Sequence, residues 1–94
     1  MSGGPAPSPE ALEALRPMLR QLREIKGLAE ARPGVVQRRG KPFATVVATG
    51  AGLLVELAKP GGSGADRLPA DTPPQQRKVV DEARLRAKRL DDED

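Results

Sequence analysis

The chain has 94 residues, which suits one small domain, and its 16 Lys and Arg against 13 Asp and Glu give a formal net charge of +3. It contains no Cys and no His, which excludes disulfide frameworks, thiolate metal sites and histidine-based catalysis. The Ser, Thr and Lys residues form no nucleophile–base motif and the acidic residues lack the spacing of a calcium loop, so we expect no enzymatic activity and no catalytic, cofactor or metal site.

Charge is unevenly distributed along the chain. Residues 91–94 (DDED) are all acidic, so residues 1–90 hold 16 basic groups against 9 acidic ones, a net charge of +7. We expect residues 91–94 to form a solvated acidic tail. No stretch approaches the ~20 apolar residues that a membrane span needs, and residues 1–7 lack the basic and apolar segments of a signal peptide. We therefore expect a cytoplasmic protein with no membrane partner.

An amphipathic helix is the first element predicted, at the start of a single domain over residues 9–90. Residues 1–8 are expected to form a flexible tail, because they offer too little apolar surface for a core. Ser8 and Pro9 are typical of a helix start. Pro17 either kinks the helix or divides it into two. Apolar residues recur at the helical spacing of three and four at Leu12, Leu15, Leu19, Leu22, Ile25 and Ala29.

Three short strands are predicted next, over residues 35–39, 43–49 and 53–58. The turns between them contain glycine and are only three or four residues long. Parallel strands need a much longer crossover, so these strands are expected to form an antiparallel meander.

The last third of the chain is expected to hold a connector and a second helix. Residues 59–72 are predicted to be a flexible connector, within which residues 66–69 can form a fourth edge strand. Thr72 and Gln75 have the spacing of a capping box, so a helix is predicted from there to about Leu90. The predicted fold class is α+β: a two-layer sandwich of a helix, a three- or four-stranded antiparallel meander and a helix, with both helices on one sheet face.

The last hairpin predicts which side chains share a sheet face. A loop over residues 50–52 pairs Thr49 with Leu53, and side chains alternate between the faces. The bulkier face is expected beneath the helices and consists of Phe43, Thr45, Val47, Thr49, Leu53, Val55 and Leu57. The opposite face is small and mostly apolar and consists of Ala44, Val46, Ala48, Leu54, Glu56 and Ala58.

This nearly uncharged face carries the leading functional hypothesis. Sheet faces exposed to water usually alternate to polar residues, and an apolar face without a cover is typical of a contact surface. We therefore expect protein–protein association, as a homodimer or with another protein, and no cofactor. The alternative is that a terminal segment or the connector of the same chain covers this face. The predicted interface residues are Ala44, Val46, Ala48, Leu54 and Glu56.

A second hypothesis rests on the basic residues. They group at the tip of the first hairpin and on the outer side of the last helix, where they suit contacts with phosphates. The near absence of aromatic residues disfavours single strands, whose bases stack on rings, so duplex nucleic acid is the expected partner. The alternative is an ordinary solvated surface. The candidate residues are Arg38, Arg39, Lys41, Arg77, Arg84 and Lys88.

The middle of the chain resembles a group of small bacterial domains. Residues 40–47 (GKPFATVV) and 52–57 (GLLVEL), with Leu68 and Pro69 before the last helix, are similar to the TfoX N-terminal and MmcQ/YjbR group over about residues 20–90. The aromatic and His residues common in that group are missing here. The resemblance implies an α+β architecture and a non-enzymatic regulator or DNA binder, and it identifies no functional residue.

Overall fold

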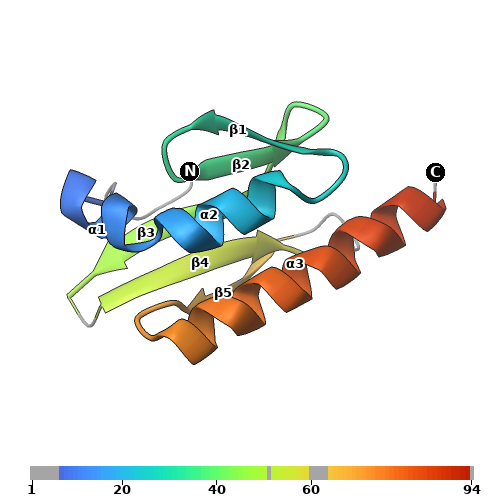
Figure 1. Cartoon of the computed structure of the whole chain (residues 1–94). Helices are drawn as coiled ribbons and strands as arrows, with labels where there is room; N and C mark the ends of the chain where they lie inside the picture. The colour runs from blue at the N-terminus through green and yellow to red at the C-terminus, as the bar shows by residue number, and fades with distance from the viewer. Residues whose placement is uncertain (1–6, 51, 60–63, 94) are drawn as a thin grey trace.

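A computed structural model describes residues 7–50, 52–59 and 64–93, the last three by their backbone alone. Within these residues the chain forms three helices and a five-stranded antiparallel sheet, which confirms the predicted α+β fold with more strands than expected. The strands lie in the sheet in the same order as in the chain (Figure 1). The elements are α1 (Pro9–Ala14), α2 (Arg16–Arg23), β1 (Leu28–Arg32), β2 (Val35–Arg38), β3 (Lys41–Thr49), β4 (Gly52–Ala58), β5 (Ala65–Pro69) and α3 (Pro73–Glu93).

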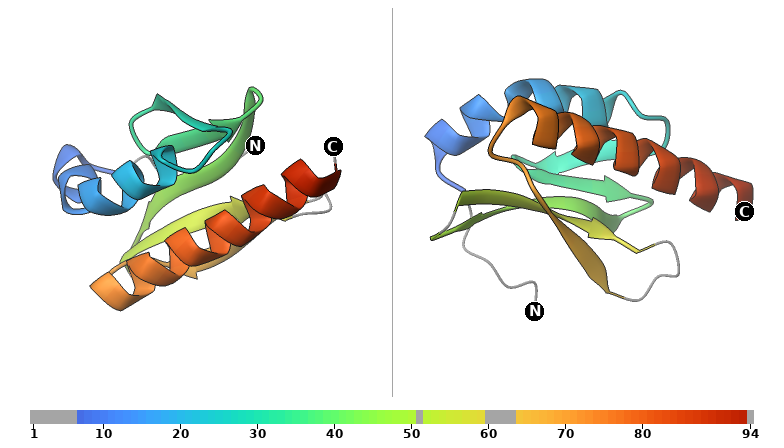
Figure 2. Two further views of the ribbon diagram at one scale, coloured as in Figure 1. Left: turned by 45° about the vertical axis from the view of Figure 1, so that its right-hand side comes forward. Right: turned by 90° about the horizontal axis from the view of Figure 1, so that it is seen from below.

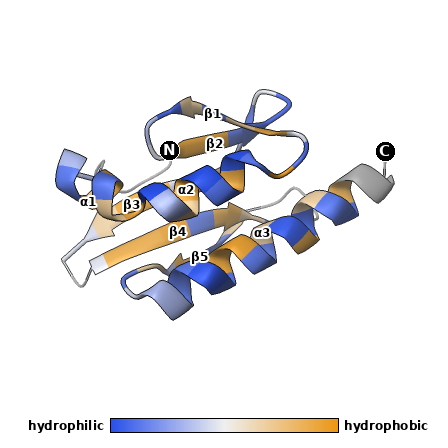
Figure 3. Ribbon diagram, in the orientation of Figure 1, coloured by the Kyte–Doolittle hydropathy of each residue, from blue (hydrophilic) through white to orange (hydrophobic). Residues whose placement is uncertain are grey.

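All three helices lie on one side of the sheet, as predicted (Figure 2). Helices α2 and α3 pack against each other above the strands, and no helix of the described residues lies on the opposite side. The outward-facing parts of both helices are largely hydrophilic, whereas hydrophobic residues concentrate in the central strands (Figure 3). We call the side beneath the helices the covered face and the other side the open face.

The first predicted helix is divided into α1 and α2 at Leu15, rather than kinked. Leu15 has φ −96° and ψ 5°, outside the helical region, and Pro17 lies in the first turn of α2. A proline is tolerated there because first-turn N–H groups have no helical acceptor. The predicted cap of α1 is confirmed, since the Ala11 N–H donates to the Ser8 hydroxyl over 3.2 Å.

Strand β1 is a correction to the sequence-based prediction, which continued the helix through Ile25 and Ala29. Helix α2 ends at Arg23, and Gly27 adopts φ +90° in the turn that follows. Glycine reaches this conformation without a steric penalty, so the chain reverses there into the sheet. Ile25 still packs at the edge of the core, but Ala29 is exposed on β1.

The fourth edge strand predicted over residues 66–69 is confirmed as β5, which pairs with β4, so this part of the predicted connector over residues 59–72 belongs to the sheet. Residues 60–63 lie outside the described residues, as do residues 1–6 of the predicted N-terminal tail. Likewise α3 runs to Glu93, three residues into the predicted acidic tail, of which only Asp94 is not described.

Hydrogen bonds join the start of α3 to the β3–β4 hairpin. The Gln75 side-chain oxygen accepts from the backbone N–H groups of Asp71 and Thr72, and the Gln75 N–H donates to the Thr72 hydroxyl, which confirms the capping box. The Asp71 carboxylate in turn accepts from the Leu53 N–H over 2.8 Å. The entry to α3 is therefore fixed to the start of β4.

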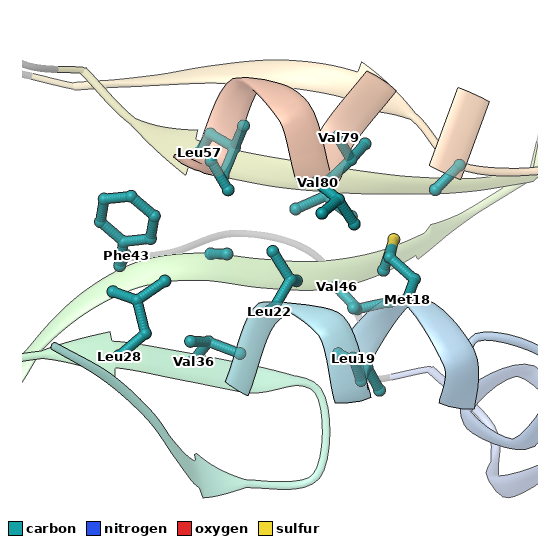
Figure 4. Close-up of a cluster of buried hydrophobic side chains, with 14 of the residues drawn as sticks. Met18, Leu19, Leu22, Leu28, Val36, Phe43, Val46, Leu57, Val79 and Val80 are labelled. Carbon is teal, nitrogen blue, oxygen red and sulfur yellow. The ribbon is translucent and has the colours of Figure 1, made fainter. Parts of the chain in front are cut away.

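The core lies between the helices and the covered face of the sheet (Figure 4). Complete burial of a Leu or Val side chain stabilises a fold by about 1.5–3 kcal/mol, so this cluster is its main stabilising feature. No helix in the described part of the chain is long and apolar enough to cross a membrane. The core residues labelled in Figure 4 are Met18, Leu19 and Leu22 of α2, Val79 and Val80 of α3, and Leu28, Val36, Phe43, Val46 and Leu57 of the sheet.

Candidate functional site

The face assignment behind the predicted protein interface is wrong for β3. In the structure Thr49 pairs with Gly52 and Val46 pairs with Val55, one residue away from the predicted register. Because the side-chain period of a strand is two, this difference moves the β3 side chains of residues 44–49 to the other face. Ala44 and Val46 are consequently core residues, 1% and 3% exposed, in the same cluster as Leu57.

The remaining predicted interface residues divide between the two faces. Ala48 pairs with Leu53, which packs against the core, so Ala48 belongs to the covered face. Leu54 and Glu56 lie on the open face, as predicted, and both are half-buried. The predicted interface is therefore not a single surface, and association of the chain with itself or another protein stays a prediction.

Phe43 keeps its predicted place in the core for a different reason. The register between β2 and β3 shifts between Val36 and Gln37, which pair with Ala44 and Pro42, so Phe43 has no partner in β2. Such a bulge places two consecutive residues toward one side. Phe43 and Ala44 are both buried in the core cluster as a result.

The true open face has a small apolar centre with polar surroundings. Val47 pairs with Leu54 there, and Val47 is only 6% exposed although it lies outside the core cluster. Thr45 pairs with Glu56 across the strands. The Glu56 carboxylate forms an ion pair with the Arg67 guanidinium over 3.3 Å. This face is more polar than the one predicted from the sequence.

The fold brings most of the predicted basic residues to one end of the molecule. The β2–β3 turn, the α2–β1 turn and the C-terminal half of α3 all lie at this end (Figures 1 and 2). Strand pairing supports this placement, because Arg38 of β2 is the partner of Leu28, which directly follows the α2–β1 turn. We call this surface the basic end, and its basic residues are Lys26, Arg38, Arg39, Lys41, Arg84 and Lys88. The C-terminal half of α3 also carries Asp91, Asp92 and Glu93.

The hairpin tip is formed by a tight turn between Arg38 and Lys41, which are strand partners. Arg39 and Gly40 occupy the turn with φ values of +53° and +79°. Two consecutive positive φ values are typical of the two-residue turns that match the twist of a hairpin. The turn thus places three basic residues next to one another at an exposed corner.

A cleft of about 320 Å³ lies between the α2–β1 turn and α3. Its cations come from both sides: Lys26 from the turn, and Arg84 and Lys88 from successive turns of α3. Glu24 also lines it. Ile25 and Ala87, which are half-buried and buried, provide its apolar part.

Arg77 does not belong to the basic end. It lies near the start of α3, beside a separate cleft of about 180 Å³ that Pro17, Gln21 and Pro73 also line. Arg77 precedes Arg84 by seven residues, or about 10 Å along a helix axis. The structure thus gathers five of the six predicted basic residues and separates the sixth.

Arg86 contributes little to the positive charge of the surface, because its side chain is held by contacts within the fold. Its side chain is 11% exposed, pairs with Asp66 over 2.8 Å and with Glu82 over 3.2 Å, and donates to the carbonyl oxygens of Leu57 and Ala58. These bonds hold α3 against β4 and β5, so Arg86 has a structural role.

Lys26 is the basic residue that the sequence-based prediction missed. The predicted helix ran past it, which made it one of several cations on a solvated helix surface. Gly27 directly after it is the signal for a turn at this position. Recognising that turn would have placed Lys26 at a corner of the fold.

Comparison with protein families, with characterised proteins and with solved structures finds no match to this chain. The resemblance to the TfoX N-terminal and MmcQ/YjbR group therefore stays a prediction. Among the residues that the structure describes, no group of three or more acidic side chains is arranged to hold a metal ion.

Proposed function

We propose that the protein binds the phosphate backbone of double-stranded nucleic acid through its basic end. The observation that carries this proposal is the convergence of cations from three separate segments: the β2–β3 turn, the α2–β1 turn and α3. Phosphate contacts of this kind supply affinity and orientation without reading the base sequence.

The availability of four of these cations supports the proposal. Within the described part of the chain, no carboxylate oxygen lies within 4.0 Å of the side-chain nitrogens of Lys26, Lys41, Arg84 or Lys88. Cations without an internal partner keep their full field in the surrounding solvent. They can therefore attract a polyanion and release the counterions condensed on it.

The position of Phe43 favours a duplex over a single strand. Binding of single strands depends largely on bases that stack on exposed rings. The only aromatic ring of this chain is 3% exposed and lies in the core. A basic end without a ring suits a double-stranded backbone, whose bases remain stacked on one another.

A matched pair of double substitutions on one helix tests this proposal. Arg84→Gln with Lys88→Gln removes two charges from the basic end, and Arg77→Gln with Lys78→Gln removes the same two charge types near the other end of α3. Fluorescence anisotropy with duplexes of arbitrary sequence is measured over a range of salt concentrations. If Lys26, Lys41, Arg84 and Lys88 each neutralise one phosphate, the logarithmic salt slope is about −3.6.

The first double variant is expected to reduce the magnitude of that slope by about 2 and to weaken binding equally for all sequences. The second variant is expected to keep a slope close to that of the unmodified protein. Equal losses in the two variants would mean that only the total charge matters and that the basic end is not the binding surface. Binding that is insensitive to salt would reject a backbone contact altogether.

A further inference from the structure

The cleft between the α2–β1 turn and α3 contains apolar residues as well as cations. Binding of a nucleic-acid phosphate backbone by the basic end does not explain the apolar residues. A surface that only neutralises phosphates needs exposed cations, yet this cleft also offers apolar contact through the half-buried Ile25. Ala87 also lines the cleft but is 2% exposed, so it fixes this wall to the core and adds little contact surface. The cleft thus combines an apolar wall with a cationic rim.

We propose that this cleft binds a phosphate monoester carried on a nucleoside, with the phosphate at the rim and the nucleoside against the apolar wall. This inference goes beyond the proposed function, because it requires a single nucleotide unit and no duplex.

The charge balance of the rim favours a monoester. Among the residues that line the cleft, Lys26, Arg84 and Lys88 stand against Glu24, which leaves an excess of two positive charges in the lining. A phosphate monoester carries about −1.5 to −2 charges at pH 7, which matches this excess. A backbone diester carries only one negative charge. The guanidinium of Arg84 can in addition donate two parallel hydrogen bonds to phosphate oxygens.

The dimensions of the cleft favour a small ligand. Its volume of about 320 Å³ is at the lower limit of known small-molecule pockets, which span about 300–1,000 Å³. A single nucleotide unit suits such a volume. Apolar contact with Ile25 distinguishes it from inorganic phosphate, which has no apolar part to bury.

Calorimetric titration of the full chain with adenosine 5′-monophosphate tests the site, with adenosine and inorganic phosphate titrated in parallel. We expect saturable one-to-one binding of the nucleotide that is about tenfold or more tighter than that of either fragment, since each fragment lacks one of the two contacts. Adenosine that binds as tightly as the nucleotide would overturn the role of the cations. Inorganic phosphate that binds as tightly would overturn the role of the apolar wall.

The same matched variants locate the site. Arg84→Gln with Lys88→Gln is expected to weaken nucleotide binding by about tenfold or more, and Arg77→Gln with Lys78→Gln by less than about twofold, because screening limits the effect of distant charges. All four side chains are exposed, so both variants are expected to fold, and circular dichroism checks this. Equal weakening in the two variants would overturn the assignment to this cleft.

A further variant separates this inference from the proposed function. Lys41 lies at the hairpin tip and does not line the cleft, so Lys41→Gln is expected to weaken duplex binding while nucleotide binding is unchanged. Duplexes with a 5′-phosphate and with a 5′-hydroxyl then distinguish two sources of the ligand. Tighter binding of the phosphorylated duplex identifies strand ends, and equal binding beside saturable nucleotide binding identifies the free nucleotide. Absence of saturable nucleotide binding overturns the inference even where duplex binding is observed.

Discussion

The two faces of the sheet meet in one strand, and Val46 and Val47 of β3 show how they differ. Both side chains are almost fully buried, at 3% and 6% exposure. Val46 lies under the helices among residues of α2 and α3, whereas Val47 lies on the open face, outside that cluster. Low exposure by itself therefore does not place a β3 side chain in the core between the helices and the sheet.

The largest difference between the faces is expected when a charge is introduced on each. Val46→Lys places an ammonium group in the core without a partner, which we expect to destabilise the fold by about 4 kcal/mol or more. Leu54→Lys puts the same group on the half-buried open face, where it can extend into water, and the expected loss is about 1 kcal/mol. Urea unfolding followed by circular dichroism measures both.

A milder substitution at the same position tests the comparison if the Val46→Lys variant does not fold. Val46→Thr keeps the shape of the side chain and buries a hydroxyl group, so we expect a loss of about 1–2 kcal/mol. Val47→Thr is its matched control and is expected to lose less than Val46→Thr. A larger loss at Val47 than at Val46 would show that the open face is covered by something that the described residues do not include.

The second comparison concerns two arginines that form ion pairs on opposite sides of the sheet. Arg86 on the helix side is 11% exposed and bonds to two carboxylates and two carbonyl oxygens, so we expect Arg86→Gln to destabilise the fold by about 2 kcal/mol. Arg67 on the open side is 67% exposed and, among the described residues, forms an ion pair with Glu56, which is 15% exposed. For Arg67→Gln we expect a loss of about 0.5–1 kcal/mol.

Thermal unfolding of the two arginine variants, measured in low and in high salt, checks this comparison. The small effect of Arg67→Gln is expected to decrease in high salt, because salt screens the exposed Arg67 guanidinium. The effect of Arg86→Gln is expected to persist. Equal losses for the two variants would mean that Arg86 is not needed to hold α3 against β4 and β5.

The smallest expected effect concerns the hairpin that decides which β3 side chains face the core. Gly52 has φ +140°, and a Cβ atom there would lie 2.5 Å from the Asp71 carboxylate, which accepts the Leu53 N–H. Gly52→Ala therefore combines backbone strain with the loss of that hydrogen bond, at an expected cost of about 1–2 kcal/mol. Gly40→Ala is the control, since Gly40 also has a positive φ, of +79°, but nothing lies within 4 Å of the added carbon.

Equilibrium unfolding of both glycine variants separates strain from collision. A loss in Gly52→Ala that does not exceed that in Gly40→Ala would show that the Asp71 contact contributes nothing to the hairpin. Amide exchange at Leu53 then reports directly whether its hydrogen bond is retained.

Local signals in the sequence were sufficient for most of the fold. The capping residues Ser8 and Thr72 predict two helix starts. The alternation of Leu53, Val55 and Leu57 identifies the core side of β4. These features depend only on residues close to one another in the chain. The α+β class and the placement of the helices on one face followed from them.

The open face of β3 could not be predicted because its local signals are ambiguous. Val46 and Val47 are equally apolar, and a loop with glycine at both ends is compatible with either register. The contact between Asp71 and Leu53, eighteen residues apart, accompanies the true register and has no sequence signature. Lys26 was missed for a related reason, since the apolar spacing of Ile25 and Ala29 continued across the turn.

The order of the strands bears on how quickly the chain can find its structure. Every strand pairs with its neighbour along the sequence, from β1 to β5, without a crossover. Each ladder can therefore close through a short loop, with a small entropic cost, and nucleation can start at any hairpin. The slow step is expected to be the packing of α2 against α3, because these helices lie near opposite ends of the chain and both cover the core.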